Sequence, residues 1–535
     1  GGVYNTRLVS YYPEGELPAS VNTLADEDLP LFTPRNQILY SNPVNNKNDN
    51  PRIFLKSILK PLKGLEAVFE YTFDKNIYDY HWYTGQYDYT TIQGGSSKSF
   101  VDDYLRKYKQ HTNYNSINVY ATYNKDFGNH HFKVMAGFNQ ESSYQETLDT
   151  YSYNQAVLDV PAMSSGTGTI KATDSYSEYA IRGGFFRVNY NYLDKYLLEV
   201  NGRYDGSSKF PKSSRFGFFP SVSAGWQIAQ ERFMNSTRHW LDGLKLRASY
   251  GVIGNQNINP YTFTPSMSVN NKATSWIIDD TYVTSISSLP ALVSQNFTWE
   301  KVGTINVGLD VNLFNNRLSG VFEWYQRNTN GMLAPGVQLP AVVGASAPYQ
   351  NTADMRTRGW ELSLNWRDQI GKVGYRIGFN LSDYKSEIIK YDDNAATKLL
   401  SSYYPGQTLG EIWGYVVDGY YTVDDFVDTS SWQLKEGVTS INGYNVRPGD
   451  VKFKNLRDDD TSTNVITSGD NTFDNPGDRK VIGNTTPRYQ YGINLGMNYA
   501  GFDLNVILQG TGKRDYWISN VLTFPMNGDN FVPLF

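Results

Sequence analysis

The chain repeats one lopsided pattern along most of its length. Two stretches of alternating apolar and polar residues are joined by a short turn, and a much longer polar segment precedes the next pair. Successive side chains of a strand point to opposite faces, so each stretch has one apolar and one polar face. Short turns at one rim and long loops at the other are typical of membrane barrels. The pattern therefore predicts an all-β fold, an antiparallel transmembrane β-barrel.

The alternation assigns individual side chains to the two faces. In residues 216–228 the even positions are mostly apolar, and in residues 303–313 the odd positions carry Ile305, Val307 and Leu309. Because neighbouring positions alternate, each such row has one face suited to lipid. We expect the following residues to face lipid: Leu198, Val200, Val307 and Leu309. We expect Asn201 and Asn306 to face the interior.

A soluble β-sandwich would show the same alternation strand by strand. Strands in soluble proteins usually have about five or six residues, whereas a tilted strand needs about 9 to 11 to cross the hydrocarbon layer. Several rows here are longer than soluble strands usually are. Aromatic residues such as Tyr196, Trp324 and Trp366 lie near their ends, as in the aromatic girdles of membrane barrels. These two features favour the membrane barrel.

Composition agrees with a barrel and excludes other classes. The 535 residues have a mean hydropathy of -0.50, and no apolar run approaches the roughly 18 residues of a membrane helix. Aromatic residues make up 15% of the chain and Cys is absent. The net charge is -5 without a basic block, so nothing indicates nucleic acid as a partner.

The turns predict a topology of about seven hairpins, or about fourteen strands. The links are residues 61–64, 125–130, 191–195, 314–317, 368–374 and 500–501, with a longer one at 230–243. The segments expected between hairpins are residues 139–178, 205–214, 251–297, 328–358 and 384–486, of which the last is the largest. If short turns are periplasmic, these long segments are extracellular.

We interpret residues 1–535 as part of one barrel domain. The strand order stops before the barrel returns to a closing strand, and no signal peptide precedes the first strands. We therefore expect the chain to be an internal piece of a longer protein.

Several stretches carry a resemblance to a known family. They are residues 187–226, 244–257 (LKLRASYGVIGNQN), 298–308 (TWEKVGTINVG), 359–364 (GWELSL), 482–501 (IGNTTPRYQYGINLGMNYAG) and 510–516 (GTGKRDY). In this order they resemble the barrel of SusC/RagA-type TonB-dependent outer-membrane transporters of Bacteroidetes. No single motif among them is specific, but the combination is.

The resemblance implies a barrel of about 22 strands with an N-terminal plug in its lumen. It implies that the inner-membrane TonB-ExbB-ExbD complex moves the plug through an N-terminal segment, and that a SusD-like surface lipoprotein caps the barrel. Cargo in the family is oligosaccharide or, in the RagA branch, oligopeptide. The TonB box, the plug, an N-terminal extension and the closing strands have no counterpart in this sequence, so we expect active import to be a property of the intact protein.

Aromatic residues in the long segments are candidates for cargo contact. Aromatic faces stack on sugar rings or pack on peptide side chains, although such rings can equally pack a loop together. The candidates are Trp82, Tyr83, Tyr403, Tyr404 and Trp413. The loop 384–486 is also acidic, and Asp458, Asp459 and Asp460 are weak candidates for calcium ligands. Arg457 precedes them and no Gly follows at the turn, so a solvated acidic loop is the favoured interpretation.

Nothing in the sequence indicates an enzyme. None of the five histidines lies in HExxH spacing, and there is no Cys nucleophile, P-loop or GxSxG motif. We expect no catalytic residue and no cofactor. The alternative to active import is a passive porin or a structural surface barrel without energy coupling.

Overall fold

The computed structural model describes most of the chain. The described residues are 44–85, 88–91, 95–98, 103–157, 160–266, 269–270, 277–278, 281–282, 285–286, 292–294, 297–457 and 464–517. Within this part of the chain, no helix is both long and apolar enough to cross a membrane.

The described residues are almost entirely β-structure. The main sheet contains β1 (Asn45–Asp49), β2 (Arg52–Leu62), β3 (Leu65–Thr84), β6 (Tyr104–Phe127), β7 (His130–Tyr153), β8 (Ile170–Tyr192), β9 (Tyr196–Ser207), β10 (Phe216–Gln227), β11 (Leu241–Asn255), β16 (Glu300–Leu313), β17 (Leu318–Pro335), β18 (Tyr349–Ile370), β19 (Val373–Tyr391), β26 (Arg488–Tyr499) and β27 (Phe502–Lys513).

Short elements lie in the connections. The short strands are β4 (Asp88–Thr91), β5 (Gly95–Lys98), β12 (Val269–Asn270), β13 (Ile277–Ile278), β14 (Thr281–Tyr282), β15 (Ser285–Ile286), β20 (Glu411–Gly414), β21 (Val417–Tyr420), β22 (Ser440–Ile441), β23 (Val451–Phe453), β24 (Val465–Ile466) and β25 (Lys480–Asn484). The 3-10 helices are η2 (Lys212–Ser214), η3 (Ile228–Gln230), η4 (Arg232–Thr237), η5 (Ala341–Val343), η6 (Asp392–Asn394) and η7 (Val423–Asp425).

The chain divides into two compact units. The first comprises residues 1–61, 66–120 and 138–182. Its strands follow the order β1-β3-β6-β7-β8, and β2 also pairs with β3. Residues 69, 119 and 138 place exposed apolar side chains on one face, and the other face carries polar contacts such as Lys56 with Glu70 and Tyr114 with Glu141. This unit has the two-faced character that alternation predicts.

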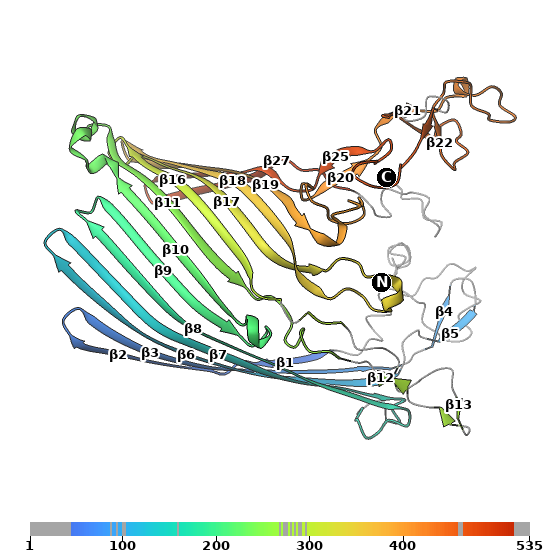
Figure 1. Ribbon diagram of the computed structural model, residues 1–535, viewed down its shortest axis with the longest axis horizontal. Coiled ribbons are helices and arrows are strands. Elements are labelled where there is room, and N and C mark those ends of the chain that lie inside the picture. Colours follow the sequence, from blue (N-terminus) through green and yellow to red (C-terminus); the bar gives the residue numbers. More distant parts are fainter. Residues whose placement is uncertain are drawn as a thin grey trace. The chain divides into compact units, whose positions relative to one another are not determined.

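The second unit comprises residues 62–65, 121–137 and 183–535. From β8 to β27 its long strands follow the chain order β8-β9-β10-β11-β16-β17-β18-β19-β26-β27, which Figure 1 shows as a succession of neighbouring arrows. Neighbouring long strands pair antiparallel, for example at Val222, which lies opposite Val200 on one side and Tyr250 on the other. Each strand therefore lies beside the next strand of the chain, as hairpins require.

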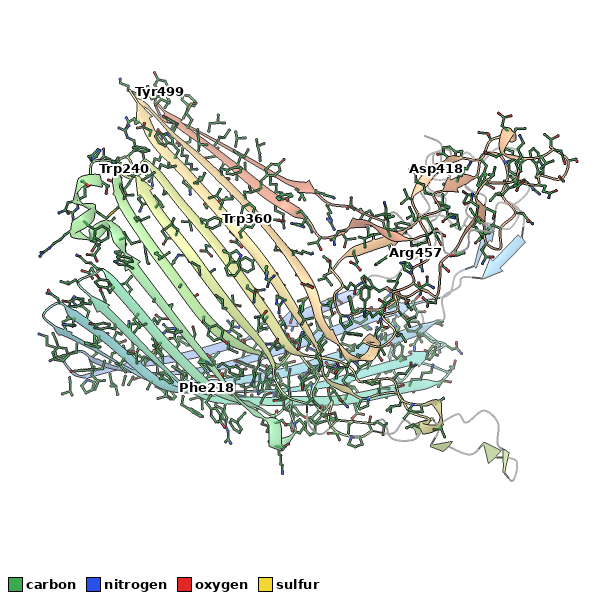
Figure 2. The ribbon with its side chains drawn as sticks, turned by 45° about the horizontal axis from the view of Figure 1, so that its top comes forward. Phe218, Trp240, Trp360, Asp418, Arg457 and Tyr499 are labelled. Carbon is green, nitrogen blue, oxygen red and sulfur yellow. The ribbon has the colours of Figure 1, made fainter. Side chains whose placement is uncertain are left out.

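The two faces of this unit differ as the sequence predicts. Leu198 and Val307 are exposed on one face, whereas Asn201 and Asn306 hydrogen-bond to carboxylates on the other. Side chains project from both surfaces of the strands in Figure 2, where Trp240 and Tyr499 mark one end and Asp418 and Arg457 lie beyond the other. A wall with exposed apolar and hydrogen-bonded polar faces is inverted relative to a soluble protein.

The predicted short turns are confirmed. β16 and β17 are joined by residues 314–317, and β26 and β27 by Ala500–Gly501, whose φ angles of 49° and 89° fit a two-residue hairpin turn. The predicted long segments were too long, because the strands continue into them. Residues 139–178 contain the ends of β7 and β8, and β19 continues to Tyr391.

Two buried apolar clusters lie in the connections or at strand ends beside them. One contains Phe210, Phe219, Phe297 and Trp299. The other contains Tyr421, Phe426 and Val446, with Trp432, Leu434, Val438 and Ile441 packed around them. We call residues 415–457 and 464–466, which hold this second cluster, the lobe.

Candidate functional site

Aromatic and charged residues gather on the polar face of the first unit, near the strand ends that flank the long connections. We call this group the Arg106 cluster. Its members are Tyr78, Tyr80 and Trp82 on β3, Tyr104, Arg106 and Tyr108 on β6, Asp149, Tyr151 and Tyr153 on β7, and Lys171 on β8. The residues within each strand are two apart, so strand geometry alone places them on one face.

Arg106 lies at the centre of the cluster. Its Nε and Nη2 donate to the two carboxylate oxygens of Asp149, each at 2.9 Å. Its Cζ lies 5.4, 5.7 and 5.2 Å from the ring centroids of Tyr80, Tyr108 and Tyr151. Two-point pairing fixes the guanidinium plane, and the rings gain cation–π attraction from it. The aromatic rings are thereby held in place before any ligand arrives.

The rings of the cluster form a connected surface. Tyr104 lies 5.6 Å from Trp82, 5.6 Å from Tyr151 and 5.7 Å from Tyr153, measured between ring centroids. Lys171 Nζ lies 4.8 Å from the Tyr153 ring, and its side chain is exposed. Such a surface offers apolar ring faces, hydroxyl groups and one exposed ammonium group, that of Lys171, which donates to the Tyr153 hydroxyl at 3.4 Å.

The structure separates the predicted aromatic candidates. Trp82 belongs to the Arg106 cluster, and Tyr403 is 51% exposed. Tyr83 and Tyr404 are buried, the latter to 1% exposure, so their rings pack against the protein. Trp413 is half-buried and its Nε1 donates to Glu411 at 2.9 Å. We therefore base the proposals below on Trp82 and its neighbours.

Tyr404 is part of the framework of the 392–487 connection. Its hydroxyl donates to Glu411, and its ring lies 5.3 Å from that of Phe473. Burial raises the pKa of Tyr404, and the hydrogen bond to the Glu411 carboxylate raises it further. The tyrosine therefore stays neutral and contributes to packing in this loop.

Acidic residues of the same connection accept hydrogen bonds from the chain itself. Asp478 is fully buried and accepts from the backbone N–H groups of Leu456, Arg457 and Thr467, at 2.8, 3.2 and 2.8 Å. Asp470 accepts from the hydroxyl of Thr472 at 2.6 Å. Asp458, Asp459 and Asp460, the calcium candidates, lie outside the described residues, within which no group of three metal-ligating side chains occurs. Calcium at this loop stays a prediction.

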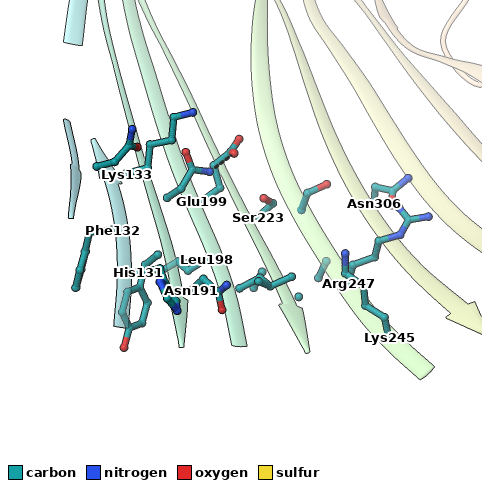
Figure 3. A pocket seen from close by; sticks show the side chains of 18 of the residues that line it. His131, Phe132, Lys133, Asn191, Leu198, Glu199, Ser223, Lys245, Arg247 and Asn306 are labelled. Carbon is teal, nitrogen blue, oxygen red and sulfur yellow. Dashed lines mark hydrogen bonds between the residues drawn. The ribbon is translucent and has the colours of Figure 1, made fainter. Parts of the chain in front are cut away.

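The second unit has a pocket of about 570 Å³ on its strand wall, lined by both charged and apolar side chains. Figure 3 shows Lys133, Glu199 and Arg247 projecting toward it from β7, β9 and β11. Glu199 is held by Asn201, whose side chain donates at 2.7 Å, and no described carboxylate forms an ion pair with Lys133 or Lys245. The pocket therefore combines fixed acceptors with free cations.

Arg247 joins three strands beside this pocket. Its Nε donates to Asp310 on β16 at 3.0 Å, and its Nη2 donates to Glu323 on β17. Gly308 lies opposite Arg247, and a Cβ there would be 2.6 Å from the guanidinium carbon. The missing side chain of Gly308 is what lets the guanidinium cross to both carboxylates.

These charged groups were not among the predicted site residues. Arg106 and Asp149 are 43 positions apart, and their pairing depends on the register between β6 and β7. The available signal was the alternation itself, since both residues occupy positions that face the polar side of a long strand. Alternation shows which face of the sheet a side chain lies on, but it does not show which residues of neighbouring strands lie side by side.

Comparisons with known proteins agree with this architecture. Residues 7–530 match the family model described as TonB dependent receptor-like, beta-barrel. The chain is 29% identical over 447 residues to TonB-dependent receptor P3 of Formosa agariphila, covering 80% of this chain and 41% of that protein. It is 32% identical over 283 residues to TonB-dependent receptor SusC of Bacteroides thetaiotaomicron, covering 51% of this chain and 27% of that protein.

A solved structure shares the fold. The RagAB peptide importer in the 'open-open' state matches with a TM-score of 0.71 at 21% identity, covering 94% of this chain and 49% of that chain. The present chain thus spans less than half the length of each of these relatives. The matches confirm the predicted antiparallel β-barrel class and the resemblance to SusC/RagA-type proteins.

Proposed function

Because the chain belongs to the TonB-dependent receptor-like β-barrel family, we propose that the intact protein imports nutrient oligomers across the bacterial outer membrane, driven by the TonB complex. In this proposal the exposed apolar face lies in lipid and the polar face lines the lumen. The long connections are extracellular and the short turns periplasmic. The proposal rests on the strands of the second unit, which expose apolar side chains on one face and carry hydrogen-bonded polar side chains on the other. The Arg106 cluster on the polar face of the first unit adds to it.

The charged residues of this pocket support the proposed energy coupling. A plug that must move is expected to meet the wall through polar groups, because permanent interfaces are the more hydrophobic ones. Lys133 and Lys245 are cations on that wall without an ion-pair partner among the described carboxylates. We propose that acidic groups of a plug domain pair with them in the closed state, and that TonB moves this domain.

The aromatic surface supports oligomeric cargo. Rings at fixed spacing can contact successive units of a sugar or peptide chain, and hydroxyl groups can bond their polar edges. SusC and the RagAB importer are similar proteins, and the second is a peptide importer by name. We propose a SusD-like lipoprotein as the lid, with oligosaccharide and oligopeptide as the two cargo classes.

The test removes rings from the polar face and leaves the strands intact. In the full-length protein, Trp82→Ala with Tyr104→Ala should weaken binding of oligosaccharide or oligopeptide fractions by about tenfold, since each aromatic contact contributes about 0.5–1.5 kcal/mol. Titration calorimetry on the purified protein and cargo-dependent growth of cells are the two measurements.

Tyr144 and Tyr176 provide the matched control. They form a ring pair with centroids 6.4 Å apart on the opposite face of the same unit. Replacing both with Ala should leave cargo binding unchanged. Equal losses from the two double variants would contradict the assignment of faces, and no loss from either would remove the cluster from the import route.

The alternative is a passive porin. It predicts that uptake in cells continues when TonB is deleted, whereas the proposed importer loses uptake but keeps cargo binding. The double variant of Trp82 and Tyr104 should therefore lose cargo binding, whereas deletion of TonB should abolish uptake but leave binding intact.

A further inference from the structure

The connection between β10 and β11 is unusual among the turns at its end of the strands. It covers residues 228–240, whereas β16 and β17 are joined by residues 314–317 and β18 and β19 by residues 371–372. It folds into the 3-10 helices η3 and η4. A connection longer than a hairpin requires often has a functional role, which the contacts of its side chains can indicate.

This connection is fastened to the turns on both sides. The backbone N–H of Gln227 donates to the carbonyl of Lys195 at 2.8 Å, and that of Phe314 donates to the carbonyl of Trp240 at 2.8 Å. The backbone N–H of Asn316 donates to Asp242 at 2.8 Å. The connection therefore has a fixed orientation on the rim of the wall.

Glu231 fixes its first turn. The carboxylate accepts from Tyr196 Oη at 2.7 Å, from Trp226 Nε1 at 3.1 Å and from Lys195 Nζ at 3.3 Å. These donors, Tyr196 and Trp226 first, lower the pKa of Glu231. The only acidic group of η3 and η4 and their flanking residues 228–240 is thus already paired, and it holds the segment against two rings of the apolar face.

The segment presents apolar and cationic groups outward. Phe233 is 66% exposed, and its ring centroid lies 6.5 Å from that of Trp226. Arg232, Arg238 and Trp240 are also exposed. No described carboxylate forms an ion pair with either arginine. Phe233 therefore extends the apolar face of the wall beyond the end of β10, with free guanidinium groups beside it.

We propose that residues 228–240 are an interfacial anchor that binds the phosphate-bearing headgroup layer of the adjacent membrane leaflet. Aromatic rings favour the boundary between headgroups and acyl chains, and arginines near it attract lipid phosphates. Continuity with the apolar face selects a lipid surface over a soluble protein as the partner. The inference rests on the proposed membrane insertion and adds a specific lipid contact to it.

The absence of Cys from this sequence allows a site-specific probe. Phe233→Cys in the full-length protein, with any cysteine outside this sequence replaced by Ser, is given a nitroxide label. It is then reconstituted into vesicles of phosphatidylglycerol and phosphatidylcholine, or of phosphatidylcholine alone. Collision rates with oxygen and with a water-soluble nickel complex report its depth. The label should lie at the headgroup boundary, whereas a label at the exposed Asn235 of the same helix should lie in water.

A third label separates this inference from the proposed function. Val222→Cys probes the apolar face of β10. If the Val222 label lies in the acyl region and the Phe233 label in water, the anchor is wrong and the barrel assignment stands. If the Val222 label is also in water, membrane insertion itself fails. A Phe233 label shielded from both reagents in cells but aqueous in vesicles would indicate a protein partner and overturn the anchor.

The charge contribution is tested with the arginines. In vesicles containing phosphatidylglycerol, each of Arg232→Ser and Arg238→Ser should reduce the immersed fraction of the Phe233 label about fivefold. Free inorganic phosphate should not displace the label, because it lacks the lipid surface. Displacement by phosphate, or no response to either substitution, would contradict headgroup recognition. Heat-modifiable gel mobility verifies that each variant is folded.

Discussion

The strand wall of the second unit and the lobe in its 392–487 connection place their apolar side chains in opposite ways. The wall exposes Phe218 to 51% and keeps hydrogen-bonded charges on its other face. The lobe buries Phe426 to 3% within its own aromatic and aliphatic cluster. Similar side chains are thus solvent-facing in one region and core-forming in the other. The difference shows that the wall depends on an apolar solvent, whereas the lobe carries its own core.

The largest effect should come from the core of the lobe. Phe426→Ala should lower the free energy of unfolding of the lobe by about 3–5 kcal/mol, since it loses both the transfer free energy and the contacts around the cavity. Hydrogen exchange should show the loss in residues 415–457, with the strands unchanged. Phe218→Ala should cost less, because fluid lipid fills the space. A larger loss at Phe218 would make the wall the better packed region.

A charge on the wall should have the next largest effect. Val222→Arg should cost about 2–4 kcal/mol near the bilayer midplane. Ser223→Arg is the matched control on the same strand, because Ser223 lies on the opposite face and pairs across the sheet with Glu199. Denaturant unfolding in vesicles, followed by heat-modifiable gel mobility, gives both values. Equal tolerance at the two positions would contradict the assigned orientation.

The smallest of the expected effects is a loss of stability of the lobe at low pH. The backbone N–H of Thr422 and the ammonium of Lys452 donate to Asp425 at 2.8 and 3.0 Å, and together they lower its pKa from 3.8. Because the folded state binds the proton less readily, this stabilisation is present above pH 3.8 and is lost as the pH falls through the lowered pKa.

The measurement is pulsed hydrogen exchange of residues 421–446 as the pH falls below 3.8. Asp425→Asn should make the lobe less stable at neutral pH and remove part of the acid dependence. An unchanged acid dependence in this variant would assign the effect to other carboxylates of the lobe.

The alternation of apolar and polar residues predicts the strands of the wall, but it does not predict where these strands end beyond the lipid layer. Rows such as residues 303–313 keep one face in lipid, so the apolar and polar positions stay distinct. Beyond the lipid both faces meet water, and the constraint on alternation ends. This is why β7 continues to Tyr153 through Glu141, Ser142 and Ser143, where the sequence pattern indicated a loop.

The site was predicted less well than the fold. The sequence indicates Trp82 as a candidate, but not that its ring contacts Tyr104 on β6, which in turn contacts Tyr151 on β7. Their meeting depends on strand register, which turn lengths and bulges determine. Tyr404 shows the converse limit, because aromatic content alone does not distinguish a ring that packs a loop from one that faces a ligand.

The pairing of Arg247 with both Asp310 and Glu323 makes side chains on three strands depend on one another. Loss of the arginine alone would leave two carboxylates facing each other, and loss of one carboxylate would leave the arginine partly paired. Substitutions at these positions are therefore expected to be non-additive. Gly308 belongs to the same set, since a side chain there would require the Arg247 guanidinium to move from its present position.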